Sequence, residues 1–435
     1  MVTHQQARRC AVIGAGAAGL SAARHLLADG HEVVVFEAGS YIGGLWVYDN
    51  DNDLSVAYSS LHINSEPKTT AYEGFPFPED TPVFPAHHDV RNYLESVADH
   101  FGIRQRIRFR TRVSAVEPIE GSSPGWTVRT ENGDEETFDV VVVGSGHQGR
   151  PAHPAWASDF TGRYLHSNSY RTPEAFAGER VLVVGVGNSG LDIAADLVPF
   201  ADRTLSSARS PVLIMPRMIL GVPSARVIGK INKPWLPWIA QRQVMRWISR
   251  LYHGTPEQWG FRTPKTRTHP ASNATYMAHV SYQRIAVRPG VTSVDGRTVV
   301  FDDGTTEDVD TIIAATGYEI DLPFLPKKVS PIVERRIEAY KRVVHPDWPG
   351  MFFIGFFNVS GGANISMMDV QSRLMAAALR DSSTLPDRAE MHRDIARERR
   401  FLAKHFPDRA RYGLELDPRR YRGQIDKLLT GRRTS

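Results

Sequence analysis

A short apolar strand followed by a glycine-rich turn and a helix occurs twice in this chain. The first copy covers residues 9–28 and has the turn GAGAAG at 14–19, and the second covers residues 180–198 and has GVGNSG at 185–190. Glycines let such a turn approach a pyrophosphate closely, and the helix N-terminus offers free N–H groups and partial positive charge. The repeat therefore predicts an α/β fold with two Rossmann-like dinucleotide-binding domains. The residues predicted to cradle the two pyrophosphates are Gly14, Gly16, Ala17, Ala18 and Gly19 in the first turn and Gly185, Gly187, Asn188, Ser189 and Gly190 in the second.

The strand that follows each helix ends in a different kind of residue. In the first copy the strand at residues 31–36 ends in Glu37, at the spacing of roughly 20 residues at which a carboxylate bonds the ribose hydroxyls of a dinucleotide. In the second copy the equivalent stretch carries Ser207 and Arg209 and no carboxylate. An acid would repel a 2′-phosphate and an arginine attracts it, so the second site is predicted to take NADP.

Composition excludes several other classes of protein. The only cysteine is Cys10, so a disulfide reductase with a pair of redox cysteines is ruled out. The formal charge of +4 is too small to indicate nucleic-acid binding, and no apolar run approaches the ~18 residues that a spanning helix needs. Without a recognisable targeting segment, a cytoplasmic protein with no membrane partner is expected.

Two further strands, at residues 139–144 and 310–317, suggest where the chain passes between the two domains. We expect an FAD-binding domain made of residues 1–170 and 309–435, interrupted by an NADP-binding domain at 171–308. Within the latter, residues 217–270 are rich in Pro, Trp and Arg and are interpreted as a lid-like insertion. Its apolar residues Val244, Trp247, Ile248 and Leu251 share one helical face, which favours a core-packed or lid helix over a membrane-surface helix.

The linker between the two copies carries a specific pattern. Phe160, Gly162, His166 and Tyr170 satisfy F-x-G-x-x-x-H-x-x-x-(Y/F), the fingerprint of the flavin-containing monooxygenases, which are class B flavoenzymes that oxygenate nitrogen and sulfur. The chain resembles this family, in its soluble bacterial type, over nearly its whole length to about residue 400. Other family-like segments are residues 43–46 (GGLW), the Asn64 segment, residues 75–80 (FPFPED), residues 316–318 (TGY) and residues 369–373 (DVQSR).

The resemblance implies a function and a set of contacts. It implies that FAD binds at the first turn and NADPH at the second, and that the enzyme uses O₂ to form a C4a-hydroperoxyflavin. A soft nucleophile, an amine nitrogen or a sulfide sulfur, is then oxygenated. Asn64 is implied as the catalytic residue, since its neutral amide can stabilise the oxygenated flavin without repelling it. The further FAD contacts implied are Gly44, Leu45, Trp46, Asn64, Val113 and Gln371, and His166 is expected to join the linker to the nucleotide.

Two alternatives stay open at this point. A Baeyer–Villiger oxygenase acting on ketones would share the fold, although relatives of that type usually carry Trp where this chain has Tyr170. A non-catalytic redox sensor that binds FAD and NAD(P)H would keep the glycine turns without needing Asn64 or the fingerprint. The expected partners are a small amine or sulfide and O₂, with no nucleic acid and no metal ion, and a homodimer is a possible assembly.

Overall fold

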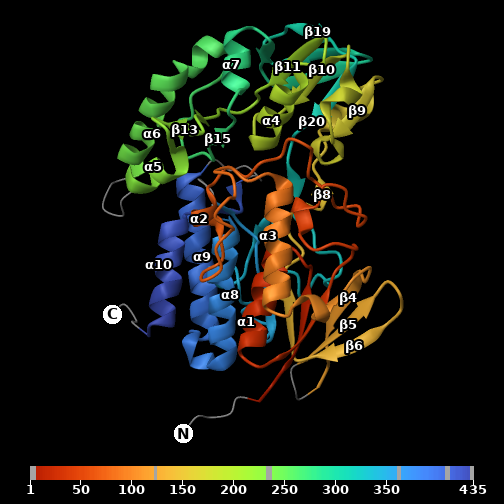
Figure 1. Ribbon diagram of the computed structural model, residues 1–435, viewed down its shortest axis with the longest axis vertical. Helices are drawn as coiled ribbons and strands as arrows, with labels where there is room; N and C mark the ends of the chain where they lie inside the picture. The colour runs from red at the N-terminus through yellow and green to blue at the C-terminus, as the bar shows by residue number, and fades with distance from the viewer. Residues whose placement is uncertain (1–5, 122–124, 232–237, 360–363, 407–411, 432–435) are drawn as a thin grey trace.

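The computed structural model describes residues 6–121, 125–231, 238–359, 364–406 and 412–431. Two five-stranded parallel sheets form the centres of two units, which lie one above the other along the long axis of the molecule (Figure 1). The sheet of the first unit contains strands from both the N-terminal third and the C-terminal third of the chain, and the sheet of the second unit lies between them in sequence. The predicted α/β class, with one nucleotide unit inserted into the other, is confirmed.

The sheet of the first unit has the order β24-β7-β1-β2-β3. Its strands are β24 (Met351–Phe353), β7 (Val140–Val143), β1 (Arg9–Ile13), β2 (Glu32–Phe36) and β3 (Ile107–Arg108). Unbroken apolar runs such as VVVV in β7 are typical of strands that are buried on both faces. Cys10 lies on β1 with no exposed surface, and burial raises the pKa of its thiol to about 12, so this sulfur is an inert core atom.

Alternate residues of these strands pack against two different layers. Val12, Val33 and Val35 contact the helical layer, which includes α1 (Ala17–Ala28), α3 (His87–His100) and α8 (Asn364–Arg380). Ala11 and Val34 instead contact an antiparallel sheet on the other face. That sheet consists of β4 (Val113–Pro118), β5 (Trp126–Thr130) and β6 (Glu135–Phe138).

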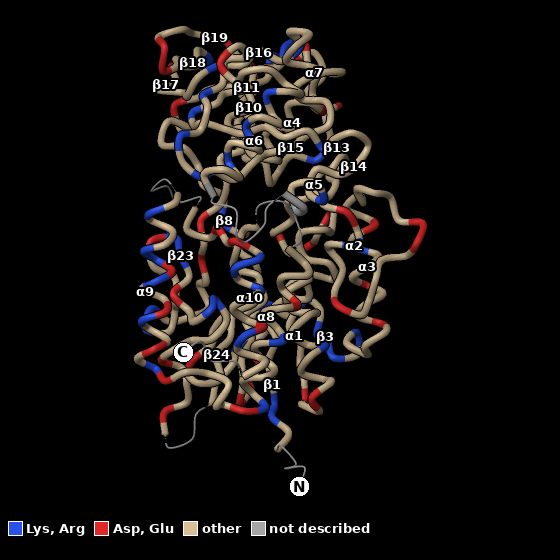
Figure 2. The backbone as a smooth tube through the Cα atoms, turned by 90° about the vertical axis from the view of Figure 1, so that its left-hand side faces the viewer, with Lys and Arg blue, Asp and Glu red and all other residues tan. Residues whose placement is uncertain are grey.

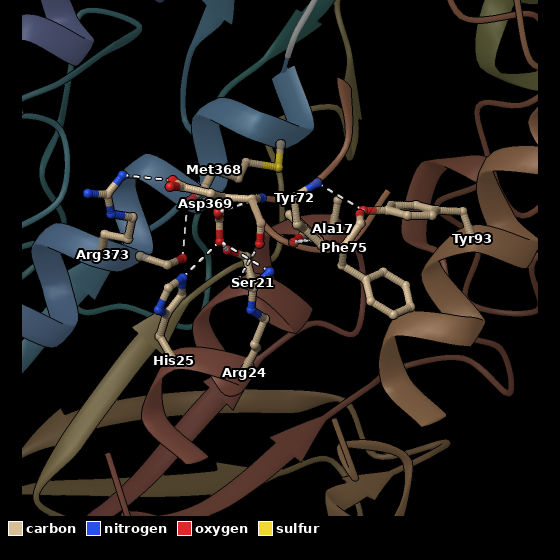
Figure 3. Close-up of polar contacts among 12 residues, drawn as sticks. Ala17, Ser21, Arg24, His25, Tyr72, Phe75, Tyr93, Met368, Asp369 and Arg373 are labelled. Carbon is tan, nitrogen blue, oxygen red and sulfur yellow. Dashed lines mark hydrogen bonds and ion pairs between the residues drawn. The ribbon is translucent and has the colours of Figure 1, made fainter. Parts of the chain in front are cut away.

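A buried carboxylate joins the helical layer together. Asp369 on α8 is 2% exposed and accepts hydrogen bonds from His25 Nε2 at 2.8 Å and Ser21 Oγ at 3.4 Å, both on α1 (Figure 3). Its second oxygen accepts from the backbone N–H of Glu73 at 3.1 Å. The 369–373 segment, which the sequence marks as family-like, therefore fixes α8 to α1 and to the loop around Glu73.

The second sheet has the order β16-β11-β10-β20-β9 and is also parallel. Its strands are β16 (Ile285–Arg288), β11 (Arg203–Ser207), β10 (Arg180–Val184), β20 (Thr311–Ala314) and β9 (Arg163–His166). One face packs on α4 (Asn188–Leu197) and α7 (Tyr276–Ser281), and the other on β17 (Val291–Asp295), β18 (Thr298–Phe301) and β19 (Thr306–Asp308). The arrangement repeats that of the first unit, as the paired sequence motifs predict.

The second unit extends beyond the predicted bounds of 171–308, because β9 and β20 both belong to its sheet. The two connections between the units run side by side as β8 (Arg150–Pro151) and β21 (Tyr318–Glu319), which pair antiparallel. We propose that the second unit runs from about residue 152 to about residue 317, where Ala152 N donates to the Gly317 carbonyl. The strand predicted at residues 310–317 is β20 in the structure. It lies beside β10, which is a central strand with a parallel neighbour on each side.

The predicted lid-like insertion contains two helices, α5 (Ser224–Ile231) and α6 (Trp238–His253). On α6 the buried side is formed by Ile248 and Ser249, and the Ser249 hydroxyl donates to the Ile214 carbonyl at 2.9 Å. Trp247 and Leu251 are 64% and 65% exposed, so the prediction that they share the packed face was wrong. The buried side is set by apolar packing of Ile248, Val244 and Met245 against Leu213, Met215 and Ile219, and Ser249 lies on this side as well.

The remaining elements are short or lie at the C-terminus. The two C-terminal helices are α9 (Arg388–His405) and α10 (Pro418–Leu429). Blue and red segments alternate along α9 in Figure 2, and its arginines form ion pairs such as Arg397 with Glu390 at 2.7 Å. None of the described helices is both long and apolar enough to cross a membrane. The other elements are η1 (Gly44–Trp46), α2 (Pro67–Thr70), η2 (Arg104–Arg106), η3 (Ala155–Asp159), η4 (Ser167–Ser169), η5 (Pro173–Phe176), β12 (Ile214–Met215), β13 (Met218–Ile219), β14 (Val222–Pro223), η6 (Pro256–Trp259), β15 (Ala271–Ser272), β22 (Ile332–Val333), β23 (Arg336–Ile337), β25 (Asn358–Val359), η7 (Ser382–Thr384) and β26 (Glu415–Leu416).

Candidate functional site

The first glycine turn lies at the carboxyl edge of the first sheet, between β1 and α1. Gly14 has a φ of +101°, which favours glycine, and its N–H donates to the Phe36 carbonyl at 2.8 Å. A Cβ at Gly19 would lie 1.8 Å from the Gly14 carbonyl oxygen, so this glycine lets α1 pack directly against the turn. The helix begins at Ala17, which places Ala17 and Ala18 in its first turn with their N–H groups directed out of the sheet edge.

A second glycine pair closes on this turn. Gly44, at the start of η1, would place a Cβ 3.1 Å from the Gly16 Cα, and the Gly43 N–H donates to the Ala15 carbonyl at 3.1 Å. Leu45 and Trp46 follow in η1 and are exposed and half-buried respectively. The structure thus brings the GGLW segment against the GAGAAG turn, as a shared pyrophosphate cradle requires.

Glu37 stands at the end of β2, beside the same turn. Its carboxylate is 4% exposed and accepts from the N–H of Ala15 at 2.7 Å and from the N–H of Gly39 at 2.9 Å. The Asn52 amide lies 3.4 Å away as a third donor. The acid is therefore held rigidly at the edge where the ribose of a dinucleotide would lie.

Two of the residues that the resemblance implies as FAD contacts have side chains that bond or pack within the protein. Gln371 is fully buried, its Oε1 accepts from the Gly355 N–H at 2.9 Å and its Nε2 donates to the Tyr421 hydroxyl at 3.2 Å. This favours a structural role for Gln371, in which it fixes the turn after β24. Val113 is 8% exposed and its side chain belongs to the core between the sheet and β4–β6.

The second turn repeats the geometry of the first at the carboxyl end of β10. Gly185 has a φ of +115°, and a Cβ at Gly190 would lie 2.0 Å from the Gly185 carbonyl oxygen. Gly187, in contrast, would place a Cβ in open space, with no atom of the described chain within 4 Å. Asn188 and Ser189 begin α4, and Asn188 Oδ1 accepts from the Ser272 N–H at 3.1 Å. Space above Gly187 fits a pyrophosphate lying on the helix N-terminus.

These two glycines give a matched pair of tests. Gly187→Ala adds its methyl only where a nucleotide would lie, so we expect unchanged stability and a KM for NADPH raised about 5- to 100-fold, from roughly 1–3 kcal/mol of overpacking. Gly190→Ala drives a methyl into backbone and is expected to lower the free energy of unfolding by about that amount or more. Denaturant unfolding and NADPH titration of both variants check this. A stable Gly187→Ala enzyme with unchanged KM would exclude the turn as the nucleotide site.

Arg209 follows β11 at the edge of the second sheet, two residues after Ser207. Its side chain is exposed and forms no ion pair with any residue in the described ranges, whereas Arg288 nearby pairs with Glu307 at 2.5 Å. Ser207 is 1% exposed and its hydroxyl donates to the Pro289 carbonyl at 2.7 Å. Arg209 therefore stays the predicted contact of a 2′-phosphate, and the guanidinium of exposed Arg262, which donates to the Arg209 carbonyl, lies beside it.

Asn64 lies in the segment that leads into α2. Ile63 N donates to the Pro85 carbonyl at 2.9 Å and Ser65 Oγ lies 2.7 Å from Thr70 Oγ1, so both neighbours of Asn64 are fixed. Asn64 Oδ1 is buried yet has no hydrogen-bond partner in the part of the chain that the structure describes. A buried acceptor without a partner is costly in a protein, and a bound ligand that donates a hydrogen bond would satisfy it.

The four fixed residues of the linker fingerprint all hold the second unit together. Phe160 packs in the core behind β10, and a Cβ at Gly162 would lie 2.5 Å from the Asp310 carbonyl. His166 is 3% exposed, and its Nε2 lies 3.0 Å from the Gly317 carbonyl. The Tyr170 hydroxyl donates to Asp196 on α4 at 2.9 Å. His166 thus joins the end of β9 to Gly317, the residue that directly precedes β21.

The protonation of His166 follows from its partners. Its Nδ1 accepts from the Asn168 N–H at 3.2 Å, so the proton of the neutral ring is on Nε2 and is donated to the Gly317 carbonyl. Burial lowers the pKa of His166, which keeps the ring neutral near pH 7. This fits a structural connection better than a proton-transfer role.

Sequence analysis missed a group of residues around Asn64. Tyr58 donates to Asp192 Oδ2 on α4 at 2.9 Å, and Arg226 of α5 forms a bidentate ion pair with Glu66. The available signal was Asp192, a carboxylate on the buried face of an otherwise apolar helix directly after the second turn. A buried charge at such a position indicates partners from elsewhere in the fold.

Comparison with known proteins gives one consistent result. The family described as flavin-binding monooxygenase-like matches residues 7–430. Flavin-containing monooxygenase 5 of Oryctolagus cuniculus is 32% identical over 434 residues, with 94% of this chain and 80% of the relative covered. Among solved structures, the S-allyl-L-cysteine S-oxygenase of Allium sativum is 26% identical with a TM-score of 0.73, covering 98% of this chain and 89% of that one. A closed cyclohexanone monooxygenase has a TM-score of 0.75 at 16% identity, covering 98% of each chain.

Proposed function

The chain belongs to the flavin-binding monooxygenase-like family, and from this premise we propose that it catalyses NADPH- and O₂-dependent oxygenation of an amine nitrogen or a sulfide sulfur. The enzyme is an FAD-dependent monooxygenase that uses NADPH. The balanced reaction consumes NADPH, a proton, O₂ and the substrate, and yields NADP⁺, water and the N- or S-oxide. The observation that carries the proposal is the match over residues 7–430, which includes both nucleotide turns and Asn64.

The chemistry that bound FAD and NADPH supply is hydride transfer followed by activation of O₂. We propose that the chain itself binds the two cofactors, orients them and shields the reacting groups from water. The Gly14–Gly19 turn with Glu37 would hold FAD, and the Gly185–Gly190 turn with Arg209 would hold NADPH. Asn64 would place a neutral amide beside the reacting groups, where it donates and accepts hydrogen bonds without adding charge. Its buried Oδ1 supports this role, because no residue in the described ranges donates a hydrogen bond to that oxygen.

A Baeyer–Villiger reaction on ketones is the alternative in the same enzyme class. The likeness to cyclohexanone monooxygenase at 16% identity concerns the fold alone. The S-oxygenase of Allium sativum is more similar in sequence, at 26%, and its name describes oxygenation of a sulfide. The comparison with the S-oxygenase therefore favours heteroatom oxygenation. The cytoplasmic location and the homodimer stay predictions, as do the individual site residues.

The proposal predicts a yellow protein that releases FAD on denaturation and converts a sulfide or a tertiary amine to its oxide. The measurement is mass spectrometry of products from a panel of tertiary amines, sulfides, indole and ketones under NADPH and air. We expect oxides of the amines or sulfides and only traces of ester from the ketones. Ester as the main product would replace the proposal by the Baeyer–Villiger alternative, and a protein that stays colourless after addition of FAD would refute both.

A further inference from the structure

The segment at residues 57–66, which carries Asn64, belongs to the first unit but is tied to the second. Ahead of Asn64, the Tyr58 hydroxyl donates to Asp192 Oδ2 at 2.9 Å and the Ser60 hydroxyl donates to Asp196 Oδ2 at 2.8 Å. The backbone N–H of Ser59 donates to the Arg171 carbonyl at 2.9 Å. Three successive residues of the segment therefore bond to the second unit.

A second contact with the second unit, between Glu66 and Arg226, lies just beyond Asn64. We call this ion pair and the Tyr58–Asp192 hydrogen bond the two ties. Glu66 is 6% exposed and accepts two hydrogen bonds from the Arg226 guanidinium on α5, one of them at 2.9 Å. In Figures 1 and 2, α5 lies directly over α2, the helix that begins immediately after Glu66. The ion pair lowers the pKa of Glu66, so the carboxylate stays charged and the contact persists across neutral pH. Asn64 is thus held between two contacts that both come from the other unit.

Asp192 is itself firmly part of the second unit. It lies on α4 two residues after Gly190, and its Oδ1 accepts from the Asn273 amide at 2.5 Å and lies 3.5 Å from the Arg217 guanidinium. Helix α4, at whose N-terminus the nucleotide is proposed to bind, is thereby connected to the Asn64 segment through Tyr58 and Asp192.

We propose that Tyr58, Asp192, Glu66 and Arg226 are positioning residues that fix Asn64 relative to the nucleotide turn of the second unit. The inference rests on the proposed function, since it assumes that Asn64 acts on the reacting groups. Loss of either tie lets the segment shift relative to the nicotinamide nucleotide, while both glycine turns stay intact. NADPH oxidation then continues while oxygenation of the substrate falls. The electrons from NADPH reduce O₂, which leaves as H₂O₂.

The chain offers a matched control for each tie. Tyr58→Phe and Tyr276→Phe each delete one buried hydroxyl that donates to a residue of the second unit, to Asp192 at 2.9 Å and to Ser206 at 2.8 Å respectively, but only Tyr58 is on the Asn64 segment. Glu66→Gln breaks an ion pair between the units beside Asn64. Arg267→Gln breaks the 2.8 Å pair of Arg267 with Asp417, which also joins the second unit to the first but lies on the C-terminal side.

The experiment measures H₂O₂ and oxygenated product per NADPH for the holoenzyme and all four variants, together with the KM for NADPH and the melting temperature. We expect Tyr58→Phe and Glu66→Gln to raise the H₂O₂ share on the order of tenfold, with the rate of NADPH oxidation nearly unchanged. Tyr276→Phe and Arg267→Gln are expected to keep the wild-type ratio, whatever they do to the melting temperature.

A double-mutant cycle with Asn64→Asp separates positioning from general destabilisation. If the ties act through Asn64, adding Tyr58→Phe to Asn64→Asp causes little further uncoupling. The inference would be overturned if the effects of Tyr58→Phe and Asn64→Asp on uncoupling multiply in the double variant, or if Tyr58→Phe and Tyr276→Phe uncouple the enzyme equally. A wild-type enzyme that binds FAD and makes oxide while these variants stay coupled refutes the positioning role alone, whereas a wild type that makes no oxide refutes the proposed function.

Discussion

Asn64→Asp is expected to reduce the oxygenated product formed per NADPH by roughly 10²- to 10³-fold, the cost of losing one preorganised donor at a site where charge develops. The substitution keeps the size of the side chain and adds a negative charge. FAD binding should survive, because the GAGAAG turn, Gly44 and Glu37 do not depend on Asn64. NADPH should still be oxidised, and the reduced oxygen should leave as H₂O₂.

The measurement is product and peroxide per NADPH consumed, for wild type and variant. Asn92→Asp is the matched control, since it adds the same charge at an exposed position on α3. We expect the control to stay coupled. If Asn64→Asp also stays coupled, Asn64 is a structural residue and its unpartnered Oδ1 has another explanation.

The parts of the fold that depend on local sequence could be predicted. Strand, turn and helix are set by apolar runs and glycines that are adjacent in the chain, so β1, α1, β10 and α4 all lie where the sequence places them. The spacing from Gly14 to Glu37 likewise reflects one βαβ unit, whose length is fixed by the geometry of the crossover.

Features that depend on contacts between distant segments could not be predicted. The helical period places Trp247 and Ile248 near one another on α6, but the side that is buried depends on the contacts of Ile248 with Leu213, Met215 and Ile219, which come from a distant part of the fold. In the same way β9 and β20 have no signal that assigns them to one sheet or the other. The pairing of β20 with β10, and of β9 with β20, required the assembled fold.

The same difference between local sequence and contacts of distant segments applies to the residues of the site. Glycine positions were predictable because only a residue without a Cβ fits them, as the 1.8 Å and 2.0 Å approaches at Gly19 and Gly190 demonstrate. Tyr58 and Glu66 gave no signal, because an isolated tyrosine or glutamate in a loop has many ordinary explanations. Their meaning appears only when Asp192 and Arg226 are brought beside them.

Arg209→Ala is expected to raise the KM for NADPH about 10- to 100-fold while leaving the use of NADH nearly unchanged. A charge-assisted contact with a phosphate contributes roughly 1.5–3 kcal/mol, which corresponds to that range in binding. The two coenzymes differ only in the 2′-phosphate, and Arg209 is the exposed guanidinium at the end of β11 that has no ion pair within the described chain. NADH is therefore the internal control, since any general damage to the turn at Gly185–Gly190 would weaken both coenzymes alike. Steady-state kinetics with each coenzyme measure the ratio, and equal losses would show that Arg209 does not contact the phosphate.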